Sequence, residues 1–206
     1  MHDIIPGILE KDPAEIEKKL KLIKPFSNTV HIDVIDGKFA ETATFQDPDF
    51  FKKYTNDFFM EVHLMVEDPV NYIKQYAQAG FKRFLGHIEK MKDIDEFIAE
   101  GQILGEVGIA IDSKTGTLNL PLDDLDVILI MGVKAGGSGQ EFLPQVLEKI
   151  ASVRQNHQIP IEVDGGINDK TIVEAKKAGA TRFVTTSYIF GAKNPAEAFQ
   201  NLTLLG

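Results

Sequence analysis

The amino-acid sequence predicts an α/β protein, a (β/α)8 TIM barrel. Three observations lead to this fold class. Apolar, β-branched runs alternate with amphipathic segments, which is the pattern of repeated βα units and a parallel sheet. Eight such runs occur, and polar side chains closely follow several of them. The 206 residues contain no linker and no low-complexity run, so we expect residues 1–206 to form one barrel domain.

An open, doubly wound sheet is the alternative architecture. It would need fewer strands than the eight that the sequence indicates. The polar side chains also favour the barrel, because a closed barrel brings the C-terminal ends of all its strands together, whereas an open sheet would scatter them. The polar and glycine residues near predicted strand ends are His31, Asp33, His63, His87, the glycine-rich segment after Met131, Asp164-Gly165-Gly166 and Ser187.

The first half of the chain contains four predicted βα units. Its strands are short runs rich in Val, Ile and Phe. Two of its helices begin at an Asp-Pro pair, Asp12-Pro13 and Asp68-Pro69, where a capping side chain precedes a proline in the first turn. We expect the order strand 4–9, helix 13–23, strand 29–37, helix 47–54, strand 59–66, helix 69–79, strand 82–88 and helix 94–99.

The second half contains the other four strands. The run 126–133 is almost unbroken in its apolar character, which fits a strand that is covered on both faces. The segment 113–122 shows little helical pattern, and we predict helix caps at Asp12, Asp68 and Asn194. We expect the order strand 106–111, strand 126–133, helix 144–154, strand 159–163, helix 169–178, strand 182–186 and helix 195–202.

Composition narrows the classes of function. The formal net charge is −9, which gives no support to a nucleic-acid-binding surface, although backbone amides could still bind a small anion. The chain has no cysteine, which excludes disulfides, thiolate metal sites and cysteine nucleophiles. We see no basic region followed by a long apolar run, and no apolar run of membrane-spanning length. We therefore expect a cytoplasmic protein that binds neither nucleic acid nor membrane.

Segment 29–37 combines a buried strand with titratable side chains. His31 and Asp33 are two residues apart, so they share one face of the strand. For this strand alone, a hydrogen bond between the two in the core would explain the pair. However, His63 lies in a second strand-like run and Asp164 ends another. Two histidines and two aspartates at three strand ends predict a metal site with nitrogen and oxygen ligands.

Five segments in order along the chain carry a family resemblance. They are VHIDVIDG (30–37), EVHLMVEDP (61–69), the run that ends in Met131, EVDGGIN (162–168) and SYIFG (187–191). Together they cover nearly the whole chain and resemble the ribulose-phosphate 3-epimerase family. The resemblance implies a barrel of the ribulose-phosphate-binding type and a metal-dependent isomerase of carbohydrate metabolism. The implied reaction interconverts ribulose 5-phosphate and xylulose 5-phosphate.

The resemblance also implies roles for individual residues. One divalent metal ion would be bound by four ligands, His31, Asp33, His63 and Asp164. The two aspartates among them would act as acid and base, and Met65 and Met131 would line the reaction plane, while Ile35 stands where a further methionine is expected. Epimerisation beside a carbonyl independently requires an acid and a base on opposite faces and a positive charge for the enediolate. The N2O2 ligand set fits zinc, iron(II), cobalt or manganese.

Departures from the family pattern cluster around the substrate. The usual serine of the first strand is Gly7, and the usual glycine after the eighth strand is Thr186, whose Cβ we expect to crowd a phosphate. Thr42 replaces an asparagine. The segment 134–140 lacks the usual Pro and Phe but keeps glycines that let backbone amides approach a phosphate, so we expect a looser flap. The predicted substrate site consists of Gly7, Met65, Met131, Gly136, Gly137, Ser138, Gly139, Gly165, Gly166, Thr186 and Ser187.

Other functions stay open beside an epimerase of ribulose 5-phosphate or another ketose phosphate. A lyase of the aldolase kind could use Lys134 as a Schiff base, although strand parity turns Lys134 away from the pocket if Met131 faces it. A non-catalytic relative could bind a metal or metabolite with an altered flap. As partners we expect a small sugar phosphate and further copies of the chain in a homo-oligomer.

Several polar residues have a structural alternative. His87 with Glu89 matches a His-x-Glu pattern of the family, and its ring either faces the pocket or is hydrogen-bonded in the core. Asp36 is expected to hold the turn before Gly37. Glu162 lies two residues before Asp164 and could support the site from the same face. We interpret His2 and His157 as surface residues.

Overall fold

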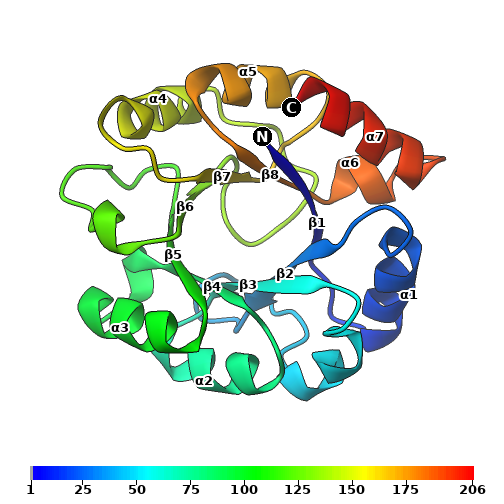
Figure 1. The fold of residues 1–206 in the computed structure, drawn as a ribbon, viewed down its shortest axis with the longest axis horizontal. Coiled ribbons are helices and arrows are strands. Elements are labelled where there is room, and N and C mark those ends of the chain that lie inside the picture. Colours follow the sequence, from blue (N-terminus) through cyan, green and yellow to red (C-terminus); the bar gives the residue numbers. More distant parts are fainter. Residues whose placement is uncertain (1) are drawn as a thin grey trace.

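The computed structural model describes residues 2–206, which contain a closed barrel of eight parallel strands. Each strand pairs with the next one along the chain, and β8 closes the ring against β1. Figure 1 looks along the barrel and shows the helices as an outer layer around the strands. The strands are β1 (Asp3–Ile8), β2 (Thr29–Ile35), β3 (Phe59–Met65), β4 (Arg83–His87), β5 (Glu106–Ile111), β6 (Val127–Met131), β7 (Ile161–Asp164) and β8 (Arg182–Thr185).

Seven α-helices and three short 3-10 helices lie between and after the strands in residues 2–206. The α-helices are α1 (Pro13–Ile23), α2 (Val70–Gln78), α3 (Ile94–Leu104), α4 (Val146–Asn156), α5 (Thr171–Ala178), α6 (Ser187–Phe190) and α7 (Pro195–Leu205). The 3-10 helices are η1 (Pro48–Tyr54), η2 (Ile88–Lys90) and η3 (Leu122–Asp124). Within residues 2–206, none of the helices has the length and apolar character needed to span a bilayer.

The predicted barrel is confirmed, and each predicted strand overlaps an observed one. Asp12 and Asn194 cap helices as expected. The prediction that Asp68 caps a helix is wrong, because Pro69 occupies the N-cap position and Asp68 lies one residue too early. Asp68 instead adopts a φ of 55°, and its carboxylate accepts a hydrogen bond from Lys92 Nζ at 2.8 Å.

Two helices differ from the prediction in type or length. Segment 47–54 forms the 3-10 helix η1 rather than an α-helix. α3 continues beyond the predicted end at residue 99, because Gly101 packs against the barrel instead of ending the helix. A Cβ on Gly101 would lie 2.5 Å from Val107 Cγ2, so the missing side chain permits close approach of α3 to β5. Segment 113–122 contains no α-helix, in agreement with its weak pattern, and only its last residue, Leu122, belongs to the 3-10 helix η3.

The outer face of the barrel forms the larger part of the core. α1 illustrates the packing, since Ile16, Leu20 and Ile23 lie on one side of the helix and are all at most 2% exposed. Each such side chain contributes about 1.5–3 kcal/mol through burial. Parallel strands that are covered on one face by helices and on the other by the barrel interior are apolar on their outward positions. This packing fixes the strands, and the strands in turn fix the interior side chains.

The interior of the barrel is divided into an apolar and a polar half. Leu85, Ala110 and Leu129, from β4, β5 and β6, form a buried apolar cluster. β2, β3, β7 and β8 instead direct charged or polar side chains inward, and β4 adds the buried Arg83 and His87 on either side of Leu85. In the β2–β3 ladder Asp33 lies opposite His63, and in the β6–β7 ladder Met131 lies opposite Asp164. The polar half therefore gathers titratable groups near the C-terminal ends of its strands.

Candidate metal centre and active site

Two histidines and two aspartates converge inside the polar half of the barrel. His31 and Asp33 come from β2, His63 from β3 and Asp164 from β7. One ligand atom from each lies within 4.8 Å of the ligand atoms of the others, and no residue of the four is more than 8% exposed. His63 Nδ1 lies 3.0 Å from Asp33 Oδ1 and 3.4 Å from Asp164 Oδ2. The structure thus brings together the four residues that were predicted as ligands.

The ring of His31 is oriented by a carboxylate on its far side. His31 Nδ1 lies 2.8 Å from Glu61 Oε1 and donates its proton to that carboxylate, so loss of the second ring proton leaves the lone pair on Nε2. His31 Nε2 is buried, lies 3.3 Å from Asp33 Oδ1 and has no hydrogen-bond partner within residues 2–206. A buried acceptor nitrogen beside two carboxylates fits a metal ion, because a cation would satisfy it.

Two arginines hold the carboxylates beneath His31. Arg182 Nη2 donates to Glu61 at 2.9 Å, and Arg182 Nε donates to Glu162 at 2.7 Å. Arg83 Nη1 reaches the same Glu61 oxygen at 2.5 Å. Glu61 and Glu162 are both fully buried, so the arginines compensate charges that would otherwise be costly in the interior. Glu162 supports the site from below, as its spacing from Asp164 suggested.

The charges of the four-residue cluster depend on one another. Burial alone would lower the pKa of His31, but the carboxylates of Asp33, Glu162 and Glu61 outweigh it and raise that pKa well above its ordinary value. Burial alone would raise the pKa of Asp33, but His31 and His63 outweigh it and hold the pKa below its usual range. Asp33 is therefore an ionised carboxylate at neutral pH.

His63 is oriented by a second chain of hydrogen bonds. His63 Nε2 lies 2.9 Å from His87 Nε2, and His87 Nδ1 lies 2.9 Å from Glu89 Oε2. A proton arrangement that suits a bound metal has His87 donating to Glu89 and His63 donating to His87, which leaves the lone pair of His63 Nδ1 for the cation. Burial raises the pKa of Glu89, but the hydrogen bond from His87 outweighs it and the pKa falls to about 2. His87 is thus a hydrogen-bonded core residue.

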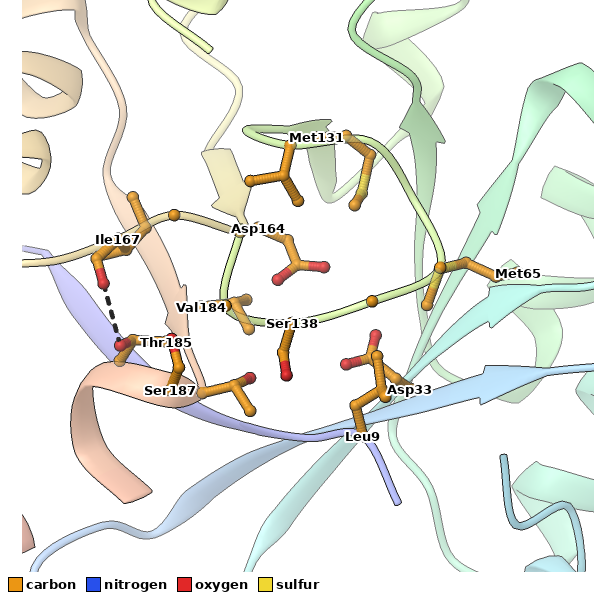
Figure 2. A pocket seen from close by; sticks show the side chains of 17 residues that line it. Leu9, Asp33, Met65, Met131, Ser138, Asp164, Ile167, Val184, Thr185 and Ser187 are labelled. Carbon is orange, nitrogen blue, oxygen red and sulfur yellow. Dashed lines mark hydrogen bonds between the residues drawn. The ribbon is translucent and has the colours of Figure 1, made fainter. Parts of the chain in front are cut away.

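A pocket opens above the cluster at the C-terminal ends of the strands. Figure 2 shows the carboxylates of Asp33 and Asp164 turned toward each other across this pocket. Ten of the eleven predicted substrate residues line it: Met65, Met131, Gly136, Gly137, Ser138, Gly139, Gly165, Gly166, Thr186 and Ser187. The mixture of apolar walls with a few polar groups is typical of a small-molecule site.

One prediction about the pocket is wrong, and one expectation from strand parity is met. Gly7 does not line it, because Thr186 lies over the position where a side chain on Gly7 would stand. Lys134 is exposed and also lies outside the lining, which removes the support for a Schiff-base lyase. Several further residues of the pocket wall were not predicted, although each lies next to a predicted site residue or two positions from one. They are Leu9, Val133, Ile167, Val184 and Thr185.

The pocket is covered by the flap loop, defined as residues 134–140. In Figure 1 this loop crosses the mouth of the barrel, and in Figure 2 it places Ser138 beside the two aspartates. Gln140 Nε2 donates to the carbonyls of Lys134 and Gly137, which braces the loop internally. Thr42 Oγ1 donates to the carbonyl of Gly136 at 2.9 Å and ties the flap loop to the loop after β2.

Asp36 stabilises the start of that second loop, as predicted. Its carboxylate accepts hydrogen bonds from the backbone amides of Lys38, Phe39 and Glu67 at 2.8–2.9 Å. Backbone hydrogen bonds of this kind outweigh burial and lower the pKa of Asp36. The residue therefore serves the geometry of the pocket mouth rather than its chemistry.

Comparison with known proteins decides the family. The model of the ribulose-phosphate 3-epimerase family matches residues 3–190. This chain belongs to the ribulose-phosphate 3-epimerase family. It is 35% identical to the ribulose-phosphate 3-epimerase of Schizosaccharomyces pombe, over 97% of this chain and 91% of that protein. It is 36% identical to the enzyme of that name from Chlamydia pneumoniae, over 90% and 86% of the two chains.

A third relative extends the family match to plants. The cytoplasmic isoform of ribulose-phosphate 3-epimerase from Oryza sativa is 32% identical, over 97% of this chain and 92% of that protein. Membership of this family makes the protein an epimerase, an enzyme of the isomerase class. The buried cluster of two histidines and two aspartates is a set that can hold a metal ion.

Solved structures support the fold of this epimerase-family chain. A 3-hexulose-6-phosphate synthase superimposes with a TM-score of 0.74 at 15% identity, covering 100% of this chain and 99% of that one. The orotidine 5'-phosphate decarboxylase of Pyrococcus horikoshii gives a TM-score of 0.67 at 18% identity, over 97% and 96%. At these identities the likeness concerns the barrel alone.

Proposed function

We propose that the protein interconverts ribulose 5-phosphate and xylulose 5-phosphate by inverting the configuration at C3. The observation that carries this proposal is the pair Asp33 and Asp164, which face each other across one pocket from β2 and β7. The names of the family relatives supply the substrate. A base on one face and an acid on the other are what inversion beside a carbonyl requires.

The proton movements follow from the two carboxylates. One aspartate, ionised, removes the C3 proton on its side of the sugar and leaves an enediolate. The other aspartate, protonated, returns a proton to C3 on the opposite side, so the two exchange protonation states in each turnover. The depressed pKa of Asp33 keeps it ionised and ready to accept the proton in one direction. In the reverse reaction the same residues exchange roles.

The metal ligands in this proposal are His31 Nε2, Asp33, His63 Nδ1 and Asp164. A divalent ion held there supplies positive charge beside the developing enediolate oxygens. The donor set contains no sulfur and fits zinc, iron(II), cobalt or manganese. Glu61 and His87 bind the outer nitrogens of the two histidines, so the protein itself keeps the inner nitrogens free for a metal.

The remaining pocket residues position the substrate and exclude water. Met65 and Met131 form apolar walls beside the aspartates, which lowers the local dielectric and strengthens electrostatic interactions inside. The flap loop and the Gly165-Gly166 turn place several glycines with positive φ along the rim. Such turns leave backbone amides free to approach an anion, which suits the phosphate group.

Proton NMR of ribulose 5-phosphate in D2O with zinc-loaded protein tests the proposal. We expect deuterium at C3 together with formation of xylulose 5-phosphate. Asp33→Asn and Asp164→Asn should each lower turnover by about 10²–10⁴-fold. Asp95→Asn, which changes an exposed carboxylate on α3, is the matched control. Absence of both exchange and epimer in the wild type, with zinc bound, would refute this substrate, and other ketose phosphates would then be examined.

Location and assembly complete the proposal. We place the protein in the cytoplasm, which the name of the rice relative supports. We also propose that the chain forms a homo-oligomer. Light scattering on the purified protein tests the assembly directly.

A further inference from the structure

Gly7 on β1 and Thr186 after β8 compete for one space at the pocket wall. Gly7 is paired in register with His31, whose side chain points into the barrel, so a side chain at position 7 would also point inward. A Cβ added to Gly7 would lie 2.6 Å from Thr186 Oγ1 and 2.8 Å from Val184 Cγ1. Both distances are shorter than real Cβ contacts, so position 7 cannot carry a side chain while Thr186 keeps its place.

The hydroxyl of Thr186 is free to bind a ligand. Thr186 is half-buried and lines the pocket, and within residues 2–206 its Oγ1 makes no hydrogen bond to the protein. Its neighbour Thr185 is different, because Thr185 is buried and its hydroxyl lies 3.4 Å from the carbonyl of Ile167. A hydroxyl at a pocket wall with unused donor and acceptor capacity is suited to a polar atom of the substrate.

The two positions differ from the family pattern in opposite ways. The pattern has a hydroxyl side chain at position 7 and glycine at 186, whereas this chain has glycine at 7 and a hydroxyl side chain at 186. Considered alone, Gly7 deletes a hydroxyl and Thr186 crowds a phosphate. In the structure Thr186 Oγ1 instead occupies the space over Gly7, so one hydroxyl has moved from one strand to the neighbouring one.

We propose that Thr186 positions the substrate through its hydroxyl and that Gly7 is needed to admit it. This inference rests on the proposed function. In it, Thr186 Oγ1 forms a hydrogen bond with an oxygen of the sugar part of a ketose phosphate. The sugar is favoured over the phosphate because Oγ1 points toward β1 and the interior, beside the strand position paired with His31. The glycines that suit a phosphate lie at the rim, in the flap loop and the Gly165-Gly166 turn.

A double-mutant cycle tests the shared space. The variants are Gly7→Ser, Thr186→Gly and the double variant, with binding of ribulose 5-phosphate to zinc-loaded protein measured by calorimetry beside KM and kcat. Each single variant should weaken binding by about tenfold, and the double variant should return to within about threefold of the wild type. A double variant as weak as the product of the two single effects would overturn the shared-space assignment. Gly116→Ser, where a Cβ meets nothing within 4 Å, is the matched control.

Two further measurements test the hydroxyl itself and do not depend on how Gly7→Ser folds. Thr186→Val keeps the shape and removes the hydroxyl, so it should raise Kd and KM for ribulose 5-phosphate about five- to tenfold with little change in kcat, and Thr186→Ser should recover most of the loss. Binding of inorganic phosphate should be unchanged in Thr186→Val. Unchanged ribulose 5-phosphate binding, or an equal loss for inorganic phosphate, would overturn the sugar assignment. Wild-type protein that binds ribulose 5-phosphate with this pattern but never converts it would refute the proposed function alone.

Discussion

Replacement of Glu61 by glutamine tests whether the charged layer beneath His31 orients the metal ligand. The Glu61 carboxylate accepts from His31 Nδ1 at 2.8 Å, Arg83 Nη1 at 2.5 Å and Arg182 Nη2 at 2.9 Å, and it is fully buried. Glutamine keeps the shape but has one acceptor oxygen and an NH2 group that only donates. At least one of the three donors must then face another donor.

The geometry gives the size of the effect. If the amide NH2 faces the arginines, two buried guanidinium groups lose a charged partner, which costs about 3–5 kcal/mol. If the NH2 faces His31, the ring must accept through Nδ1 and carry its proton on Nε2, the atom assigned to the metal. The metal Kd should then rise about 10–100-fold. For a chain of 206 residues, 3–5 kcal/mol corresponds to a fall in Tm of about 6–20 °C.

Thermal unfolding of metal-free protein and zinc calorimetry measure both effects. Glu106→Gln is the matched control, because Glu106 also pairs with Arg83 but its side chain is 43% exposed, so its loss should cost under about 1 kcal/mol. An unchanged Tm together with unchanged zinc affinity in Glu61→Gln would refute the orienting role. Equal effects in the two variants would show that Arg83, rather than His31, is the partner that matters.

Three other perturbations address the rest of the site. His87→Leu removes the acceptor for His63 Nε2, so the Kd for zinc should rise about 10–100-fold. A smaller rise than in Glu89→Gln would contradict the role of His87 in orienting His63. The raised pKa of His31 means that protons compete with the metal for this ring. Zinc affinity measured by calorimetry should therefore fall on acidification, starting above about pH 6.5. A zinc Kd that does not change between about pH 6 and 8 would show that His31 is no ligand. Gly166→Ala places a Cβ 2.8 Å from Phe142 at a φ of 72°, so Tm should fall by at least about 2–4 °C, whereas Gly116→Ala, in open space, should not lower it.

Local patterns were sufficient to predict the barrel and the buried cluster of two histidines and two aspartates. β-branched runs and Asp-Pro helix starts define the order of elements, and i, i+2 spacing put His31 and Asp33 on one face. Helix α3 and the Asp68 turn were less predictable, because a tertiary contact decided the first and the position of Pro69 decided the second. The same i, i+2 spacing relates Glu61 to His63, so it would have placed the side chain of Glu61 inside the barrel as well.

Apart from Glu162, the charged residues beneath His31 were not predicted, because charged strand residues usually indicate a solvent-facing position. Arg83 lies opposite Glu61 in the β3–β4 ladder, whereas Arg182 comes from β8 and reaches Glu61 only because the barrel is closed. The relation between Gly7 and Thr186 was also hidden, since β1 and β8 lie at opposite ends of the sequence and meet only when the ring closes. Contacts between segments that are far apart in the sequence are therefore the features of the fold and the site that a local sequence pattern does not predict.

The hydrogen bond between Thr42 and Gly136 sets how easily the pocket exchanges its contents. A neutral hydrogen bond contributes about 1 kcal/mol, which shifts an equilibrium between joined and separated loops by only about fivefold. The two loops can therefore part and rejoin often, while the aspartates and histidines stay fixed on strands that are held by the barrel. Opening of the pocket mouth does not require the aspartates and histidines to move, so the enzyme can release a small, polar product while these side chains keep their positions.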